Sequence, residues 1–202
     1  DLKPNRLEAA KDVAAEFING RPNDNIGITL FAGETFTQCP LTVDHAVLLD
    51  MIHNIKCGLI TDGTAVGMGI ANAVTRLKDS KAKSKVIILL TDGTNNKGDI
   101  SPMTAAEIAK SFGIRVYTIG VGTNGMAPYP YPVGNTVQYV SMPVEIDEKT
   151  LTEIAGTTDG NYFRATSNSK LKEVYEEIDK LEKTKLNVKE YSKRDEEYHW
   201  FA

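Results

Sequence analysis

The chain has 202 residues, of which 41% are apolar and 25% charged, and its formal net charge is -4. These values are typical of one globular domain with a sizeable core and exclude an extensively disordered chain. The acidic balance and the lack of a basic block argue against nucleic acid as the main partner. No run of about 18 apolar residues is present, so no segment of this sequence is expected to cross a bilayer.

The first quarter of the chain alternates helical and extended patterns. Apolar residues at helical spacing predict a helix over Arg6–Asn19, and alternation with a period of two predicts a strand over Asn25–Ala32. A second extended piece, Thr35–Pro40, follows a short turn and is the expected antiparallel partner of that strand. A helix over Val43–Asn54 comes next, with Thr42 as its cap.

The middle of the chain repeats a helix-and-strand order. Thr64–Leu77 is rich in small residues and is predicted to be a helix with its first residue at the N-cap. The continuous apolar run Lys85–Leu90 is typical of a strand buried on both faces. Pro102–Phe112 is predicted to be a helix with Ser101 as its cap, and Arg115–Gly122 a second buried strand.

The one long irregular stretch is Thr123–Glu145, which contains four prolines. We expect it to form an extended loop or a hairpin at one end of the sheet. Loops of this length in compact domains are often functional, and its tyrosines Tyr129 and Tyr131 are candidates for partner binding.

The last part of the chain returns to regular elements. A helix over Asp147–Ala155 is expected to stop at Gly156, followed by a strand over Asn161–Ala165 and a final helix from Ser169 to about Lys185. Residues 1–185 are therefore the predicted domain. Residues 186–202 form a charged tail with an aromatic end; because tryptophan and tyrosine favour the membrane–water interface, this end either leads towards a membrane segment or has no such meaning.

The order of the elements predicts the fold class. Strands that alternate with helices form a parallel sheet covered on both faces. We therefore expect a three-layer α/β/α sandwich with a doubly wound, mostly parallel sheet and one antiparallel edge strand, Thr35–Pro40.

Two polar residues stand where predicted buried strands and helices meet. Asp92 directly follows a buried strand, so its carboxylate is held rigidly and can serve a hard cation. The alternative is a turn residue that bonds its own backbone. Thr64 stands at a predicted helix start, where its hydroxyl is either a second ligand or only an N-cap.

Together these residues carry a resemblance to a known family. Gly63–Gly67 (GTAVG) and Leu89–Gly93 (LLTDG) resemble two parts of the metal-ion-dependent adhesion site (MIDAS) of von Willebrand factor A (VWA) domains. The segments KPNRLEAAK, FAGETFTQCPLT and TIGVG are similar to the bacterial Bat (aerotolerance operon) branch of that family, of its BatA or BatB type.

The resemblance places the family's first motif, D-x-S-x-S, upstream of Asp1. It implies that this motif ends a central strand, so the natural protein is expected to have residues before Asp1, unless a neighbouring molecule supplies the strand. It also implies a divalent cation, Mg²⁺ or Mn²⁺, in the intact domain. Thr64 and Asp92 alone offer too few oxygens for Mg²⁺, so weak binding or none is expected from this chain by itself.

The resemblance further implies non-enzymatic protein–protein recognition. An acidic side chain of the partner would fill an open position on the ion, and other proteins of the Bat operon are candidate partners. Asn95 and Asn96, beside Asp92, join the two tyrosines as candidate partner-binding residues. The protein is expected to be anchored in a bacterial inner membrane by segments outside this chain, with this domain in the periplasm and a link to oxidative stress.

Three other functions are alternatives: a nucleotide-binding protein, a hydrolase and a metal-independent scaffold. Gly120–Gly125 spells G-x-G-x-x-G, but the proline-rich sequence after it cannot start the helix that a nucleotide site needs. A hydrolase would need a base or nucleophile near the strand ends, where Asp62, Asp92 and Asp99 are the candidates. A metal-independent scaffold is the third.

Cys39 and Cys57 are either free thiols or a disulfide.

Overall fold

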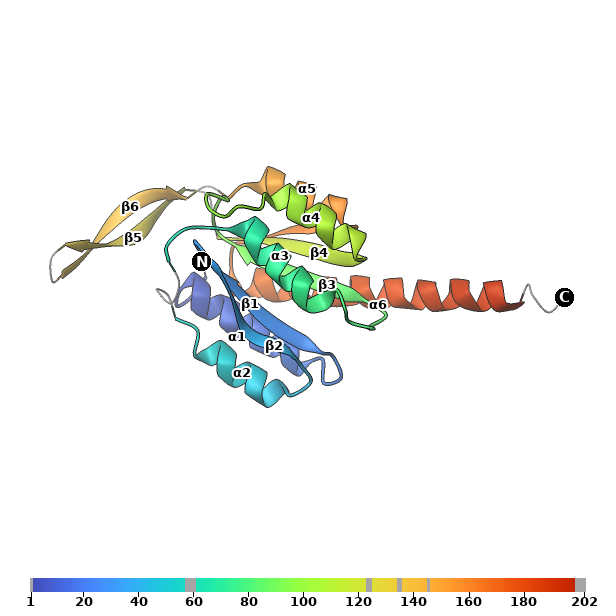
Figure 1. The fold of residues 1–202 in the computed structure, drawn as a ribbon. Coiled ribbons are helices and arrows are strands. Elements are labelled where there is room, and N and C mark those ends of the chain that lie inside the picture. Colours follow the sequence, from blue (N-terminus) through green and yellow to red (C-terminus); the bar gives the residue numbers. More distant parts are fainter. Residues whose placement is uncertain (1, 57–60, 123–124, 134–135, 145, 199–202) are drawn as a thin grey trace.

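The computed structural model describes residues 2–56, 61–122, 125–133, 136–144 and 146–198, and only the backbone within 125–144 and 186–198. Figure 1 shows the arrangement. The helices are α1 (Arg6–Asn19), α2 (His45–His53), α3 (Val66–Leu77), α4 (Pro102–Ser111), α5 (Glu148–Thr157) and α6 (Asn168–Tyr198). The strands are β1 (Ile26–Phe31), β2 (Thr35–Thr42), β3 (Lys85–Thr91), β4 (Ile114–Val121), β5 (Gly125–Val133), β6 (Thr136–Val144) and β7 (Tyr162–Ala165).

The strands form three separate hydrogen-bonded groups. β3, β4 and β7 make a parallel sheet in that order, with Lys85 opposite Ile114 and Thr118 opposite Tyr162. β1 and β2 pair antiparallel, as predicted, and β5 and β6 form an antiparallel hairpin. The strands expected in one sheet thus form two pieces among the described residues, because β1 is not hydrogen-bonded to β3.

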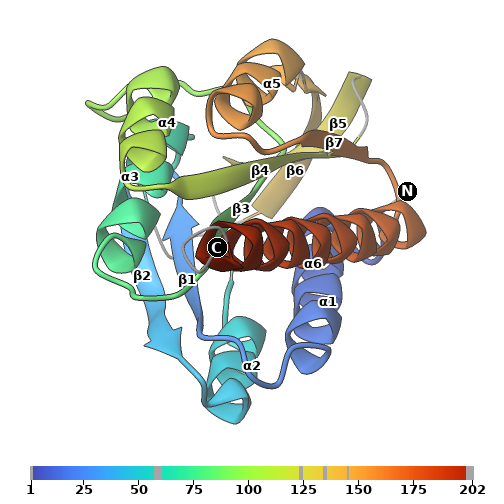
Figure 2. The ribbon, with the colours of Figure 1, turned by 90° about the vertical axis from the view of Figure 1, so that its right-hand side faces the viewer.

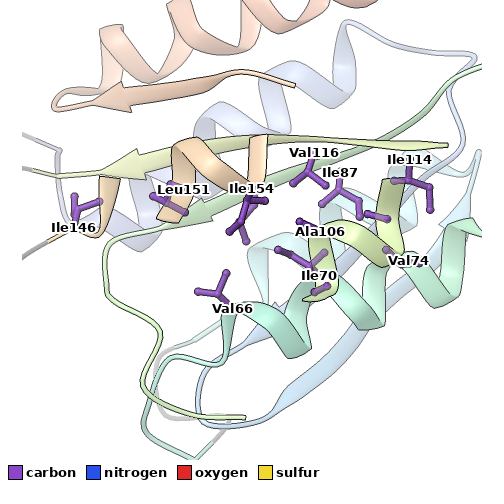
Figure 3. Packing of buried hydrophobic residues seen from close by; sticks show 13 residues of the cluster. Val66, Ile70, Val74, Ile87, Ala106, Ile114, Val116, Ile146, Leu151 and Ile154 are labelled. Atoms are coloured by element: carbon purple, nitrogen blue, oxygen red, sulfur yellow. The ribbon is translucent and has the colours of Figure 1, made fainter. Parts of the chain in front are cut away.

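Helices cover the parallel sheet on both faces, which confirms the predicted α/β layers. In Figure 2, α4 and α5 lie on one side of β4 and β7, and α1 and α6 on the other. The first side holds the cluster drawn in Figure 3, where α3, α4 and α5 meet β3 and β4 through Val66, Ile70, Val74, Ile87, Ala106, Ile114, Val116, Ile146, Leu151 and Ile154. The second side holds Val13, Tyr117, Ile119, Val121, Ala165, Leu171, Val174, Tyr175 and Ile178.

Two predicted helix caps are wrong. α2 begins at His45, and the carboxylate of Asp44 accepts its capping bond from the Val47 N–H at 3.2 Å. Thr42 instead accepts a bond from the Asp44 N–H. α3 begins at Val66 with no side-chain cap, because Thr64 stands two residues earlier in a turn. Local sequence could not separate a hydroxyl that caps a helix from one that stands a residue or two before the cap.

Three further expectations differ from the structure. α5 passes through Gly156 and ends at Thr157, with Thr158 as its C-cap. α6 continues to Tyr198, well beyond Lys185. β3 is fully buried on one face only: Ile87, Leu89 and Thr91 are buried, while the alternate residues are half-buried. The proline-rich stretch takes the hairpin form of the two forms expected.

A buried polar cluster ties α6 to the sheet. Glu182 of α6 is only 5% exposed and accepts hydrogen bonds from Tyr117 Oη at 2.6 Å and Ser84 Oγ at 2.8 Å. It also forms an ion pair with Arg115 of β4. Burial raises the pKa of Glu182, but the three hydrogen bonds outweigh burial, so its pKa lies below the ordinary value.

Cys39, a buried thiol on β2, has no disulfide partner among the described residues. Cys57, the partner considered from the sequence, lies outside those residues.

Candidate functional site

Asp92 lies at the end of a well-anchored strand. It follows Thr91, the last residue of β3, whose pairing with Gly120 of β4 fixes that end of the sheet. Its side chain is 53% exposed, so the carboxylate faces solvent at the carboxyl edge of the parallel strands. Ligands of such sheets gather at this edge, because the loops that follow the strands converge there.

Arg6 of α1 forms an ion pair with Asp92. Its Nη1 donates to Asp92 Oδ2 at 2.8 Å. The position of Arg6 is set by the start of α1, where Asn5 caps the helix by accepting a bond from the Glu8 N–H at 2.9 Å. The first turn of α1 therefore borders the site.

Thr64 lies against the loop that carries Asp92. Its N–H donates to Asn96 Oδ1 at 2.9 Å, and its carbonyl accepts bonds from the N–H groups of Asn96 and Lys97 at 2.9 and 3.3 Å. A β-carbon on Gly93, the residue after Asp92, would stand 3.1 Å from Thr64 Oγ1. The hydroxyl therefore lies beside the turn that follows Asp92, so the structure places the two predicted metal ligands on neighbouring loops.

Two glycines stand on either side of Thr64 at positions that disfavour a side chain, one because of packing and one because of its backbone conformation. A β-carbon on Gly67 would lie 2.1 Å from the carbonyl oxygen of Ile100, so the start of α3 presses directly on the backbone before α4. Gly63 has φ +138°, a conformation that side chains with a β-carbon rarely adopt. Both ends of the G-T-x-x-G motif are therefore places where glycine is favoured.

The side-chain oxygens described at this site are of the type that a hard cation binds, but they are too few to complete its coordination. They are the Thr64 hydroxyl and the Asp92 carboxylate; Asn95, three residues after Asp92 in the same loop, adds a buried side-chain oxygen, Oδ1, with no hydrogen bond within the described residues. No cluster of three histidine, cysteine, aspartate or glutamate side chains suited to a metal occurs in the described part of the chain. Mg²⁺ requires near-octahedral oxygen coordination, so these side chains alone do not complete such a site.

The predicted partner-binding residues fall into two groups. Asn96 holds the backbone of Thr64 and is exposed, and Asn95 stands beside it in the same loop. Tyr129 and Tyr131 lie on β5, opposite Val140 and Gln138; their side chains lie outside the described residues. The hairpin follows β4, so it leaves the sheet from the same edge as Asp92 and extends away from the body in Figure 1.

Sequence reasoning did not single out Arg6. A signal was available, because a positive charge in the first turn of a helix opposes the helix macrodipole and suggests a role elsewhere. The partner, 86 residues away, could not be read from the sequence.

Comparison with known proteins identifies the family to which this fold and site belong. Residues 3–177 match the von Willebrand factor type A domain, so the chain belongs to the VWA family. It is similar to the crystal structure of BatB from Bacteroides thetaiotaomicron, with 34% identity, a TM-score of 0.78 and 91% of each chain covered. An aerotolerance-related membrane protein from Bacteroides fragilis is 30% identical, with a TM-score of 0.77 and 89% of each chain covered. The expected relation to the Bat branch is confirmed.

The chain spans about half the length of the curated relatives it matches. An uncharacterized protein of Borreliella burgdorferi is 28% identical over 186 residues, which are 92% of this chain and 54% of the relative. No helix in the described ranges is both long and apolar enough to span a membrane.

One more distant relative carries metal. Proximal thread matrix protein 1 of the mussel byssus has been solved with a zinc-occupied MIDAS motif; it is 25% identical, with a TM-score of 0.67, and the match covers 88% of this chain and 41% of that one.

Proposed function

We propose that this chain is a non-enzymatic protein-recognition domain whose partner docks at the carboxyl edge of the parallel sheet. The observation that carries the proposal is the hydrogen bonding between Thr64 and Asn96, which holds Thr64 against the loop that follows Asp92. Threonine and aspartate from separate loops converge there with an exposed carboxylate, an arrangement suited to binding a charged group of a partner.

In the whole protein, Thr64 and Asp92 would help to hold a divalent cation, Mg²⁺ or Mn²⁺, with an acidic side chain of the partner at its open position. The metal-bearing mussel relative and the oxygen character of the donors support this step. Asn95, Asn96 and the β5–β6 hairpin would form the surrounding partner surface. Other Bat-operon proteins are the proposed partners.

The cellular setting is also a proposal. The similar Bacteroides fragilis protein is named an aerotolerance-related membrane protein. By analogy, segments outside this chain would anchor the protein in a bacterial inner membrane, with the domain in the periplasm and a role in oxidative-stress tolerance.

Calorimetric titration with Mn²⁺ tests the metal step. It should be done on this chain and on a version extended at its N-terminus. We expect binding by the extended version, and loss of that binding in Asp92→Ala because the carboxylate is the only charged donor among the described site residues. Asp79→Ala is the matched control, because Asp79 is an exposed carboxylate beyond the far end of α3.

Pull-down with and without chelator tests recognition. Partner capture that is lost with chelator and in Asp92→Ala supports a metal-dependent domain. Capture unaffected by either change favours the metal-independent scaffold. Turnover of a hydrolase or nucleotide substrate that depends on Asp62, Asp92 or Asp99 would overturn the proposal and favour an enzyme.

A further inference from the structure

The prolines of the β5–β6 hairpin all lie in alternate residue pairs, that is, in every second pair along the two strands. Pro128, Pro130 and Pro132 of β5 stand opposite Ser141, Tyr139 and Val137, and Pro143 of β6 stands opposite Met126. Antiparallel pairs alternate between hydrogen-bonded and non-hydrogen-bonded, and proline has no N–H to donate. The proline-containing pairs are therefore the non-hydrogen-bonded ones, whose N–H and C=O groups point outward from the hairpin.

Because of this alternation, the two outer edges of the hairpin differ in the number of N–H groups that they can donate. On β5, the outward positions are Met126 and three prolines, so only Met126 can donate to an added strand. On β6, the outward positions are Val137, Tyr139, Ser141 and Pro143, and the first three each keep an N–H. A proline row blocks strand addition on β5, whereas the edge of β6 is open to it.

The open edge of β6 also lacks the charged residues that ordinarily prevent strand pairing. Residues 125–144 contain no charged residue, although a quarter of the whole chain is charged. Exposed edge strands are ordinarily kept apart by lysine or other charged side chains. In Figure 1 the hairpin extends away from the rest of the molecule, so a second strand can approach β6 without meeting the helices.

We propose that β6 pairs antiparallel with β6 of a second copy of this chain, with Tyr139 on the two-fold axis. In this register Val137 stands opposite Ser141 of the second copy, so all outward N–H groups of Val137, Tyr139 and Ser141 find carbonyl partners. Pro143 lies beyond the paired segment. The proline pattern allows this self-complementary register without losing a ladder bond inside either hairpin.

The same pattern limits the assembly to two copies. Pairing through β6 leaves a β5 edge on each side of the resulting four-stranded sheet, and both edges carry the proline row. A two-fold interface of this kind is closed, whereas an edge that could pair on both sides would grow into a fibre. This inference is independent of metal and of the recognition site at Asp92.

Sedimentation over a range of concentrations tests the pairing. The 202-residue chain should form dimers, and Tyr139→Pro should weaken dimerisation roughly tenfold, because both central N–H groups are lost. Met126→Pro is the matched control: it adds a proline to the other edge and should leave the dimer unchanged. Tyr139→Ala keeps the N–H and should also still dimerise, which separates the backbone from the ring.

A converse variant tests the blocked edge. Replacing Pro128, Pro130 and Pro132 together by serine should restore donors on β5 and extend assembly beyond the dimer. Circular dichroism should show an unchanged folded body in every variant. A wild-type chain that stays monomeric at the highest concentrations, or a Tyr139→Pro dimer as tight as the wild-type one, would overturn the proposal.

Discussion

Arg6 occupies a helix position where the macrodipole disfavours a positive charge. Its guanidinium offsets this by pairing with Asp92 at 2.8 Å, and it neutralises the carboxylate that a divalent cation would use. The arginine and a metal ion therefore compete for the same oxygen. Because both side chains are substantially exposed, the ion pair is a weak competitor.

We expect Arg6→Gln to strengthen Mn²⁺ binding by the N-terminally extended chain by up to about fivefold, since an exposed ion pair contributes at most about 1 kcal/mol. Calorimetric titration of the variant and the parent measures the change. Arg6→Lys keeps the charge and serves as the control. Weaker binding in Arg6→Gln would mean that the arginine supports the ion.

At the scale of elements, the start of α3 is set by contact with the segment before α4. Gly67 lies so close to the carbonyl oxygen of Ile100 that a β-carbon would overlap it at 2.1 Å. The oxygen belongs to the backbone and cannot move aside alone. By contrast, Gly156 lies within α5 with nothing within 4 Å of its β-carbon position.

These two glycines predict opposite effects of the same substitution. Gly67→Ala should destabilise the chain by about 2–3 kcal/mol through overpacking. Gly156→Ala should stabilise it by about 0.5–1 kcal/mol, because alanine is the better helix former in an uncrowded position. Urea unfolding of both variants measures the difference. Equal effects would show that α3 is not held by this contact.

At the scale of the molecule, the Glu182 cluster joins the C-terminal helix to the sheet. Glu182 and Arg115 are 7% and 15% exposed at their side chains, so each is mostly shielded from water. Removing one partner of a buried pair leaves the other charge uncompensated. We expect Glu182→Gln to cost about 3 kcal/mol of stability in denaturant unfolding; Glu173→Gln, an exposed glutamate on the same helix, is the control.

The same cluster predicts acid sensitivity. The pKa of Glu182 in the folded chain lies below its ordinary value near 4.5, so its contribution to stability is present above that pH. The contribution is lost as the pH falls through the folded-state pKa. Unfolding free energy measured from about pH 7 down to about pH 3 should therefore fall less in Glu182→Gln than in the parent. Parallel pH profiles would contradict this role.

Tyr117 makes the stability of the folded chain depend on pH in the alkaline range as well. Burial, followed by its hydrogen bond to Glu182, raises the pKa of Tyr117 above its ordinary value of 10. The neutral hydroxyl is thus favoured in the folded chain, and this stabilisation is lost as the pH rises above 10 and unfolded chains ionise.

Most elements were predictable from the sequence because their signals are local. Helical spacing located α1 at its observed bounds, Arg6–Asn19, and the apolar run KVIILL located β3. Cap assignments failed at Thr42 and Thr64, because a hydroxyl near a helix start can bond a loop or turn instead. The end of α6 was missed, since its charged surface gives no stop signal.

The sequence by itself determined the order of helices and strands, the two loop motifs and the resemblance to the VWA family, because these depend on neighbouring residues. Only the tertiary structure decided which distant residues meet: Arg6 with Asp92, Gly67 with Ile100, and Glu182 with Tyr117. Such contacts depend on how whole elements pack, and packing brings together positions whose local sequences carry no record of each other.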